Sequence, residues 1–315
     1  MIPFSNMDIS VVIPNYNGEG LLKKNLSKVY EELKNYRSGN FEIIVVDDAS
    51  SDDSVSFLKG LAKDYNLKIV GNEKNLGFSP TVNKGVKIAS GEVVILLNTD
   101  IYPETGFLDP LLSHFKEDEN VFAVGCLDKS IEGEKTVLRG RGLGEWKRGF
   151  LVHRRGEVDK TDTLWASGGS SAFKKVIWER LGGLNDLFAP FYWEDIDISY
   201  RALKSGYKVI FEPKSVAIHE HEKGAIHSKF SDDQVKVIAY KNQFIFVWEN
   251  ADSNLLLSHV LWLPYHKLKA LMRLDWTFFL GFFNALLVIP KVLRARRKAR
   301  KLFVKNDAEI MREFV

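Results

Sequence analysis

The sequence predicts an α/β protein with a mainly parallel central sheet flanked by helices. Short apolar or β-branched runs alternate with segments of helical spacing through the N-terminal third of the chain. Repeated βα units need crossover connections, and crossovers make neighbouring strands parallel. The expected strands are residues 9–13, 41–46, 67–70 and 93–97, and the expected helices are residues 19–33, 54–65 and 81–89.

Size and composition describe an ordinary folded chain. Its 315 residues suffice for one large domain with an appendage or for two modest domains, and 45% are hydrophobic and 27% charged. Cys126 is the only cysteine, which excludes an intramolecular disulfide and a cysteine-based metal cluster. Apolar neighbours predict a buried, unreactive Cys126. The N-terminus lacks the pattern of a signal peptide, so we expect a cytoplasmic protein.

Polar residues follow three of the predicted strands. In a doubly wound sheet the carboxyl ends of such strands meet at one crevice, where ligands bind. Clustered carboxylates repel one another unless a cation or a ligand uses them, so the pattern favours a metal and nucleotide site. Ordinary turns and helix caps are the alternative for each loop taken alone. The residues are Asn15, Tyr16 and Asn17, then Asp47 and Asp48, then Asn98, Thr99 and Asp100.

The middle of the chain is rich in Gly, Arg and Lys. Residues 127–162 are flanked by core-like segments, which predicts a long functional loop. The basic residues of 139–155 can contact a diphosphate, or they form a solvated basic loop. Beyond it we expect a flexible segment at 166–171, helices at 174–181 and 195–205, and apolar runs at 207–211 and 215–218.

Two adjacent acids, Glu194 and Asp195, begin the second of these helices. Aromatic residues at 188, 191, 192 and 193 would partly desolvate them and raise their pKa values toward that of a useful general base. The alternative is that acids are simply favoured at a helix N-terminus by the macrodipole. Asp197 and Arg201 are spaced to form an ion pair along the helix.

The C-terminal tail is apolar and then basic. Residues 255–263 and 276–289 are apolar, and residues 291–301 carry clustered Lys and Arg. Residues 276–289 are shorter than the roughly 20 residues that span a bilayer, so interfacial helices beside anionic lipid are expected. A helical cap packed on the protein or on another subunit is the alternative. We therefore divide the chain into residues 1–250, the catalytic domain, and residues 251–315, a membrane-associating helical extension.

Six motifs stand in a familiar order along the chain. The sequence resembles the family 2 glycosyltransferases of the GT-A fold, particularly bacterial rhamnosyltransferase-like members, over about residues 8–246. The motifs are VVIPNYNG (11–18), VVDDASSDDS (45–54), NEKNLGFSPTVNKG (72–85), LLNTD (96–100), SGGSSAF (167–173) and GGLNDLFAPFYWEDIDISYRALKSGY (182–207).

The resemblance implies a nucleotide-sugar donor bound with Mg²⁺ or Mn²⁺. It assigns Asp100 to the metal and Asn98 to the ribose, although the family commonly has Asp at this first position. His219 becomes the second metal ligand, with His221 and His227 as substitutes. The other residues implied to contact the donor are Pro14 and Tyr16 at the base, Asp47 or Asp48 at the base imide, and Asn17, Asn75, Gly77 and Asn83.

The same resemblance assigns the general base to Asp195, with Glu194 and Trp193 placed to hold the acceptor. Gly168 and Gly169 would let a sugar approach the backbone closely, or they form a plain tight turn. One base without a second nucleophile implies direct displacement, and hence inversion at the anomeric carbon.

The resemblance thus implies sugar transfer from dTDP-rhamnose or a UDP-hexose to a hydroxyl of a glycan or a polyprenyl-diphosphate-linked acceptor, in cell-surface polysaccharide synthesis at the inner face of the membrane. A catalytically inactive sugar-nucleotide-binding scaffold is the alternative. A dinucleotide-dependent oxidoreductase is disfavoured because no Gly-x-Gly-x-x-Gly follows the first strand. No nucleic-acid partner is expected, and an oligomer is allowed.

Overall fold

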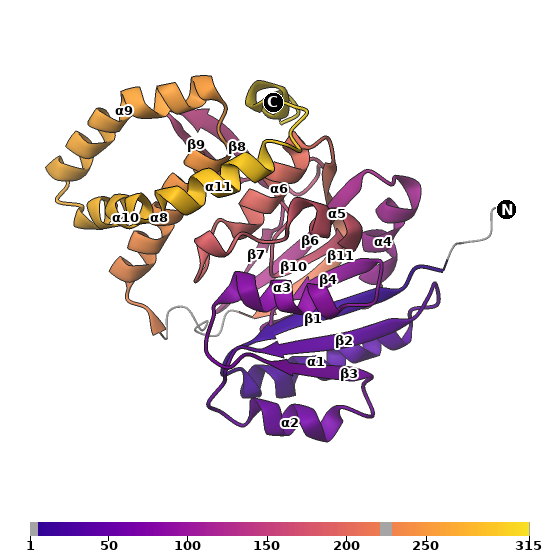
Figure 1. Cartoon of the computed structure of the whole chain (residues 1–315). Helices are drawn as coiled ribbons and strands as arrows, with labels where there is room; N and C mark the ends of the chain where they lie inside the picture. Colours follow the sequence, from indigo (N-terminus) through magenta and orange to yellow (C-terminus); the bar gives the residue numbers. More distant parts are fainter. Residues whose placement is uncertain (1–5, 221–228, 315) are drawn as a thin grey trace.

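The computed structural model describes residues 6–220 and 229–314 and confirms the α/β architecture (Figure 1). Within them, one sheet of nine strands has the order β3-β2-β1-β4-β10-β6-β11-β5, with β7 paired to β6, and β8 pairs with β9. The strands are β1 (Ile9–Asn15), β2 (Phe41–Asp47), β3 (Leu67–Gly71), β4 (Val93–Leu97), β5 (Ile101–Pro103), β6 (Val121–Glu132), β7 (Lys135–Arg139), β8 (Gly142–Lys147), β9 (Phe150–Arg155), β10 (Ser170–Lys174) and β11 (Lys208–Glu220).

Helices cover both faces of this sheet, and Figure 1 shows α1 and α2 on one side of β1–β3 and α3 on the other. They are α1 (Glu19–Lys34), α2 (Ser54–Leu61), α3 (Phe78–Ile88), α4 (Leu108–Glu117), α5 (Lys175–Leu181), α6 (Glu194–Lys204), α8 (Asp232–Asn250), α9 (Ser253–Met272), α10 (Trp276–Leu287), α11 (Ile289–Ala299) and α12 (Asp307–Arg312), with a 3₁₀ turn η1 (Asp186–Phe188).

The two faces follow from the alternation of side chains along each strand. Val11 and Ile13 of β1 belong to the apolar cluster formed with α1, α2 and α4. Val12, between them, belongs to the cluster formed with α3, α5 and α6. Because both faces are buried, the central strands read as continuous apolar runs, as expected for parallel strands.

The sheet is mixed rather than parallel throughout. β3, β2, β1 and β4 pair in parallel, in agreement with the predicted βα units. β10 then runs antiparallel to both β4 and β6, β11 is parallel to β6, and β5 is antiparallel to β11. Residues 170–174 therefore form a central strand, and the expectation of a flexible segment at 166–171 is wrong for Ser170 and Ser171, which belong to this strand.

The expectation of a long loop over residues 127–162 is also wrong. β6 continues to Glu132 and β7 folds back on it, after which β8 and β9 form a separate hairpin. Its tight turn has positive φ at both Arg148 (50°) and Gly149 (78°), as a two-residue hairpin turn requires. The frequent glycines and charges hid these strands, which are largely exposed: β7 has no buried residue and β9 is buried only at Phe150 and Leu151.

The C-terminal helices pack on the rest of the protein. α8 contacts α6 as well as α9, α10 and α11. Buried Lys204 of α6 lies 2.9 Å from both Asp252 Oδ1 and Asp307 Oδ1, so one ammonium joins α6 to the start of α9 and to α12. The division at residue 250 remains a prediction, but the two parts share this buried ion cluster.

We expect Lys204→Met to lower the free energy of unfolding by about 3 kcal/mol, because it leaves the buried Asp307 without its cation. Urea denaturation followed by circular dichroism measures the loss. Lys208→Met is the matched control, since Lys208 forms an exposed ion pair with Asp118 and should cost less than about 1 kcal/mol. Equal losses in the two variants would contradict the structural role of Lys204.

In the described residues, no helix taken singly combines the length and apolarity needed to cross a bilayer. α10 and α11 reach that length and composition only together, and they are bent by 68° relative to each other.

Candidate active site

Asp100 and His219 come together although 119 positions separate them in the chain. Asp100 immediately precedes β5, and β5 pairs with β11 so that Ile101 lies opposite His219. His219 Nε2 is 3.2 Å from Asp100 Oδ2, and His219 Nδ1 is 2.9 Å from Asp128 Oδ2. Asp128, on β6, was missed from the sequence because it lies in the segment interpreted as a loop.

The two carboxylates determine the charge of His219. Burial opposes the charged imidazole, but the hydrogen bonds and negative charges of Asp100 and Asp128 outweigh it and raise the pKa of His219 to about 9. This raised pKa favours the protonated form of His219 while it lies between the two acids. A bound cation would take the place of the proton on Nε2.

The donor set suits a hard divalent cation. Asp100 Oδ1 is buried and has no hydrogen-bond partner among the described residues, so one carboxylate oxygen is free to coordinate. Within the same residues no three His, Cys, Asp or Glu side chains form a complete metal site. Asp100 and His219 can thus hold a cation only if other ligands, such as phosphate oxygens, contribute. His221 and His227 lie outside the described residues.

Glu194 and Asp195 begin α6 after a strained turn. Tyr192 and Trp193 both have positive φ, 72° and 76°, which is costly for residues with a Cβ and typical of functional sites. The half-buried Asp195 accepts hydrogen bonds from the Ile196 N–H at 2.8 Å and the Gly168 N–H at 3.4 Å. Glu194 is buried, and its Oε2 has no partner among the described residues.

The pKa values of Asp195 and Glu194 are both raised, which favours their protonated forms. Burial raises the pKa of Asp195 above its ordinary range, and backbone hydrogen bonds only partly oppose this. Burial, followed by the nearby charge of Asp195, also raises the pKa of Glu194. A carboxylate held at a higher pKa is a stronger base when it is ionised, which suits proton abstraction from an alcohol.

The Gly168–Gly169 turn lies between the segment that carries Asn98 and Asp100 and the segment that carries Asp195. The Asn98 N–H donates to the Gly169 carbonyl at 2.9 Å, while the Gly168 N–H donates to Asp195. A Cβ on Gly169 would lie 2.8 Å from Asn98 Nδ2, so a side chain there would displace the ribose-assigned amide. The group that lies close to this backbone in the structure is the Asn98 side chain, and the predicted approach of a sugar stays a prediction.

Asp47, the last residue of β2, and Asp48, which follows it, are buried and already hydrogen-bonded. Asp47 accepts from Asn15 Nδ2 at 2.8 Å and from the backbone and hydroxyl of Ser50. Asp48 accepts from the Leu76 and Gly77 N–H groups, each at 2.8 Å, and thereby fixes the start of α3. Each acid orders one loop of the crevice, and the choice between them as the base ligand stays a prediction.

Of the other residues assigned to the donor, most lie on the loops around this crevice. Pro14 and Tyr16 are half-buried at the end of β1, and Asn17 accepts from the Ser51 N–H at 2.8 Å. Asn75 is exposed on the loop before α3. Asn83 instead bonds Leu184 with both ends of its amide, at 2.8 and 3.0 Å, so it joins α3 to a distant loop.

Asn242 of α8 holds the turn that precedes the two acids. It is fully buried, and its Nδ2 lies 2.7 to 2.9 Å from the carbonyl oxygens of Phe188, Phe191 and Tyr192. These contacts fix the strained backbone before Glu194 and Asp195 in place. No local pattern marks Asn242, because its partners lie at least 50 positions away in the chain.

In the basic stretch of residues 139–155 some side chains contact the rest of the protein, whereas Lys147, Arg154 and Arg155 are exposed. Arg141 is buried and pairs with Asp162, and Arg148 donates to the hydroxyl of Tyr265 on α9. On β9 the ring of His153 lies edge-on to Trp193, with ring centres 5.2 Å apart. The β8–β9 hairpin therefore lies beside the acids of α6.

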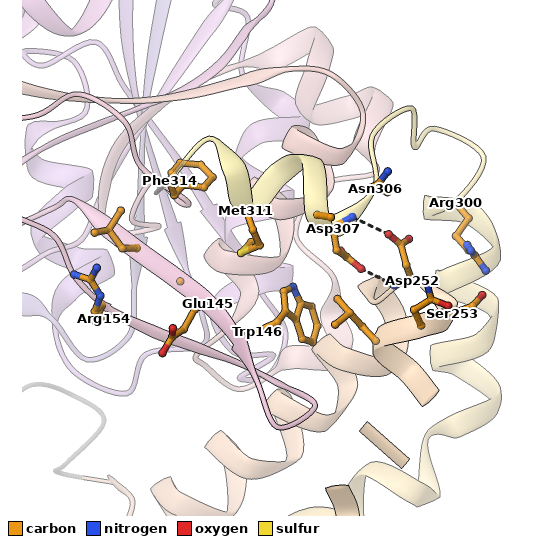
Figure 2. Close-up of a pocket in the computed structure, with 15 residues that line it drawn as sticks. Glu145, Trp146, Arg154, Asp252, Ser253, Arg300, Asn306, Asp307, Met311 and Phe314 are labelled. Atoms are coloured by element: carbon orange, nitrogen blue, oxygen red, sulfur yellow. Dashed lines mark hydrogen bonds between the residues drawn. The ribbon is translucent and has the colours of Figure 1, made fainter. Parts of the chain in front are cut away.

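A cavity of about 1000 Å³ lies elsewhere, between β8 and the C-terminal helices (Figure 2). Trp146, Arg154, Asp307 and Phe314 line it, and none of the predicted site residues does. The candidate site is therefore identified by converging polar side chains at the strand ends rather than by this cavity.

Comparison with curated proteins gives relatives that transfer sugars. The chain is 28% identical over 242 residues to a GalNAc(5)-diNAcBac-PP-undecaprenol β-1,3-glucosyltransferase of Campylobacter jejuni, covering 75% of this chain and 69% of that protein. It is 32% identical over 130 residues to a dolichol-phosphate mannosyltransferase of Pyrococcus furiosus, covering 41% of this chain and 35% of the relative. The chain thus spans only about a third of the second relative.

Solved structures share the fold. TarS residues 1–349 of S. aureus, in complex with UDP-GlcNAc, has a TM-score of 0.60 at 17% identity, covering 97% of this chain and 90% of that one. GalNAc-T7, solved with UDP, GalNAc and Mn²⁺, has a TM-score of 0.65 at 20% identity over 78% and 48% of the two chains. The family model described as glycosyl transferase family 2 matches residues 10–182. The chain belongs to glycosyl transferase family 2, with the GT-A fold.

Proposed function

We propose that the chain is an inverting glycosyltransferase that moves a sugar from a nucleoside-diphosphate donor to a hydroxyl of a glycan or lipid-linked acceptor. The observation that carries the proposal is the pair of acidic groups joined by the Gly168–Gly169 turn, Asp100 with His219 on one side and Asp195 on the other. The named activity of the Campylobacter relative supports a polyprenyl-diphosphate-linked acceptor. dTDP-rhamnose and UDP-hexoses are the proposed donors.

Asp100 and His219 would hold Mg²⁺ or Mn²⁺, as supported by the Mn²⁺ in related structures. When bound, the ion supplies positive charge that neutralises the departing diphosphate. Asp195 accepts the proton of the attacking hydroxyl on its carboxylate oxygen. Glu194 and Trp193 orient the acceptor. With one general base and no covalent intermediate, the anomeric centre is inverted.

A screen of nucleotide sugars tests this proposal. Each donor is added with and without Mn²⁺, and both the thermal unfolding midpoint and the released nucleoside diphosphate are measured, with a short-chain polyprenyl-diphosphate glycan as acceptor. We expect a Mn²⁺-dependent stabilisation and turnover with at least one donor. Stabilisation without turnover would instead support the inactive binding scaffold, and no response to any donor would overturn both readings.

The raised pKa of Asp195 predicts an unusual pH profile. A general base works only when deprotonated, so kcat/KM should fall as the pH drops through its pKa. Because burial raises that pKa, the acid limb should lie above the value of about 4 typical of an exposed aspartate. Initial rates at several pH values, with donor and Mn²⁺ saturating, measure the limb. An acid limb at or below the ordinary aspartate range would contradict the prediction.

Asn242→Ala should lower kcat by about 10- to 100-fold, because the turn that positions Asp195 loses its hydrogen bonds. KM for the donor should change less than kcat, since Asn242 itself bonds only the turn before Glu194 and Asp195. Gln243→Ala on the same helix is the matched control, as Gln243 makes only a long 3.4 Å contact with the Leu151 carbonyl. Loss of stability with an unchanged kcat would show that Asn242 only supports the fold.

We also propose that the protein works in the cytoplasm on the inner face of the membrane, with residues 251–315 in peripheral contact with it. A lipid-linked acceptor would make such a location necessary.

A further inference from the structure

The exposed apolar side chains are gathered on three C-terminal helices. Of the 23 large apolar side chains that are exposed in the described residues, 15 lie between Leu257 and Leu293, on α9, α10, α11 and the turn joining α9 to α10. Soluble monomers rarely expose apolar surface so concentrated in one region. We therefore expect a partner molecule or a lipid surface to cover this region.

α10 has two different faces. Its inner face packs tightly on α8, since a Cβ on Gly281 would lie only 2.5 Å from Tyr240 Cβ and 2.9 Å from the Val237 carbonyl. Its outer face repeats at helical spacing, and each of these side chains is at least 54% exposed. The outer residues are Trp276, Leu280, Phe283 and Leu287.

α9 continues this apolar surface. Leu257, Leu261 and Leu268 share one side of the helix and are 58 to 69% exposed, whereas His259 and Ala270 on the other side are buried. Lys267 and Lys269 flank Leu268, about 100° to either side around the helix axis. An apolar face bordered by lysines is typical of a helix that lies in a membrane interface.

Basic residues of α11 follow the apolar surface that α9 and α10 form. Six exposed basic residues on and just after α11 make no ion pair with any described residue. Arg296 differs, because it is buried and donates to the carbonyl oxygens of Trp248 and Glu249, at 3.0 and 3.2 Å. The unpaired residues are Lys291, Arg294, Arg297, Lys298, Arg300 and Lys301.

We infer that the outer faces of α9 and α10 insert into the interface of an anionic lipid bilayer, with the α11 cations binding the lipid phosphates. The packing of α10 on α8 leaves only the outer face of α10 for lipid, and α10 with α11 has the length and composition of a span only as a pair bent by 68°. Anionic headgroups would neutralise the α11 cations, which have no ion-pair partner among the described residues, whereas an apolar contact with a second copy would not by itself do so.

This inference deepens the proposed function and takes its biological meaning from it. Figure 1 shows the turn between α9 and α10 on the same side of the molecule as the carboxyl ends of β1 and β2, where the candidate site lies. An acceptor anchored in the bilayer would then be presented to that side.

Vesicle flotation with the full chain tests the inference without any need for turnover. Vesicles of equal parts phosphatidylglycerol and phosphatidylcholine are compared with vesicles of phosphatidylcholine alone, at low and high salt. The variants are Leu261→Glu with Leu268→Glu on α9, and Leu280→Glu with Phe283→Glu on α10. Val176→Glu is the matched control, because Val176 is 63% exposed on α5, away from this surface.

We expect binding to the anionic vesicles that weakens with salt, falls by at least about tenfold in each double variant and is unchanged in Val176→Glu. These positions are exposed, so the variants should keep the wild-type circular dichroism spectrum. Absence of vesicle binding, or binding that survives both double variants, would overturn the inference. Dimerisation in light scattering that the same variants abolish would assign the surface to a second copy instead. Donor turnover in solution is measured separately, so the two proposals can fail independently.

Discussion

Asp195→Asn should reduce sugar transfer by about a thousandfold while leaving donor binding intact. Asparagine has nearly the same shape as aspartate, and its Oδ1 can still accept the Ile196 N–H hydrogen bond. Its amide cannot take the proton of the acceptor hydroxyl, however, so only the chemical step is lost. Turnover is measured as released nucleoside diphosphate, and donor affinity is measured by calorimetry with Mn²⁺ present.

Asp233→Asn is the matched control, because Asp233 also lies in the first turn of a helix but is exposed and far from the site in the chain. It should transfer at the wild-type rate. If Asp195→Asn kept about a tenth of the wild-type rate or more, the base would lie elsewhere, with Glu194 the next residue to test. If donor binding were lost as well, the carboxylate would belong to the donor site instead.

Asp100→Asn should reduce transfer by about a hundredfold or more and abolish the effect of Mn²⁺ on nucleoside-diphosphate binding. The amide keeps the size of the side chain and a hydrogen bond to His219, but it is a weaker ligand for a hard cation than a carboxylate. Removing the metal with a chelator should lower wild-type activity to a similar level. The binding measurement provides a readout that does not depend on catalysis.

For the wild-type protein, the thermal unfolding midpoint with UDP or dTDP should rise further when Mn²⁺ is added, whereas in Asp100→Asn it should not. Asp118→Asn serves as the control, since Asp118 pairs with Lys208 at the surface. The same Mn²⁺ response in wild type and Asp100→Asn would remove Asp100 from the metal site and leave its pair with His219 as a structural contact.

Much of the fold could be predicted because its signals are local. The four parallel strands and the helices between them have continuous apolar runs and clear helical spacing, since each is buried against the sheet. The edge segments β7, β8 and β9 have one exposed face and many charges, so the same method interpreted them as loop. β10 was hidden among small residues, which are typical of turns as well as of tightly packed strands.

Part of the candidate site could likewise be predicted from the sequence, and part could not. The acids and amides at the strand ends were visible as polar residues after apolar runs, and Asp100, His219 and Asp195 were named from motifs. Asp128 and Asn242 were not identified from the sequence, because each acts through partners far away in the chain. For Asn83, the motif predicted a contact with the donor, whereas in the structure its amide bonds Leu184.

By itself the sequence determined the α/β class, the parallel half of the sheet and the polar loops at its strand ends, because these depend on residues close together in the chain. Only the tertiary structure decided that β10 enters the sheet antiparallel, that His219 lies between Asp100 and Asp128, and that α8 holds the turn before Asp195. Each of these depends on packing between distant segments, and no local pattern of side chains records which distant partner a residue will meet.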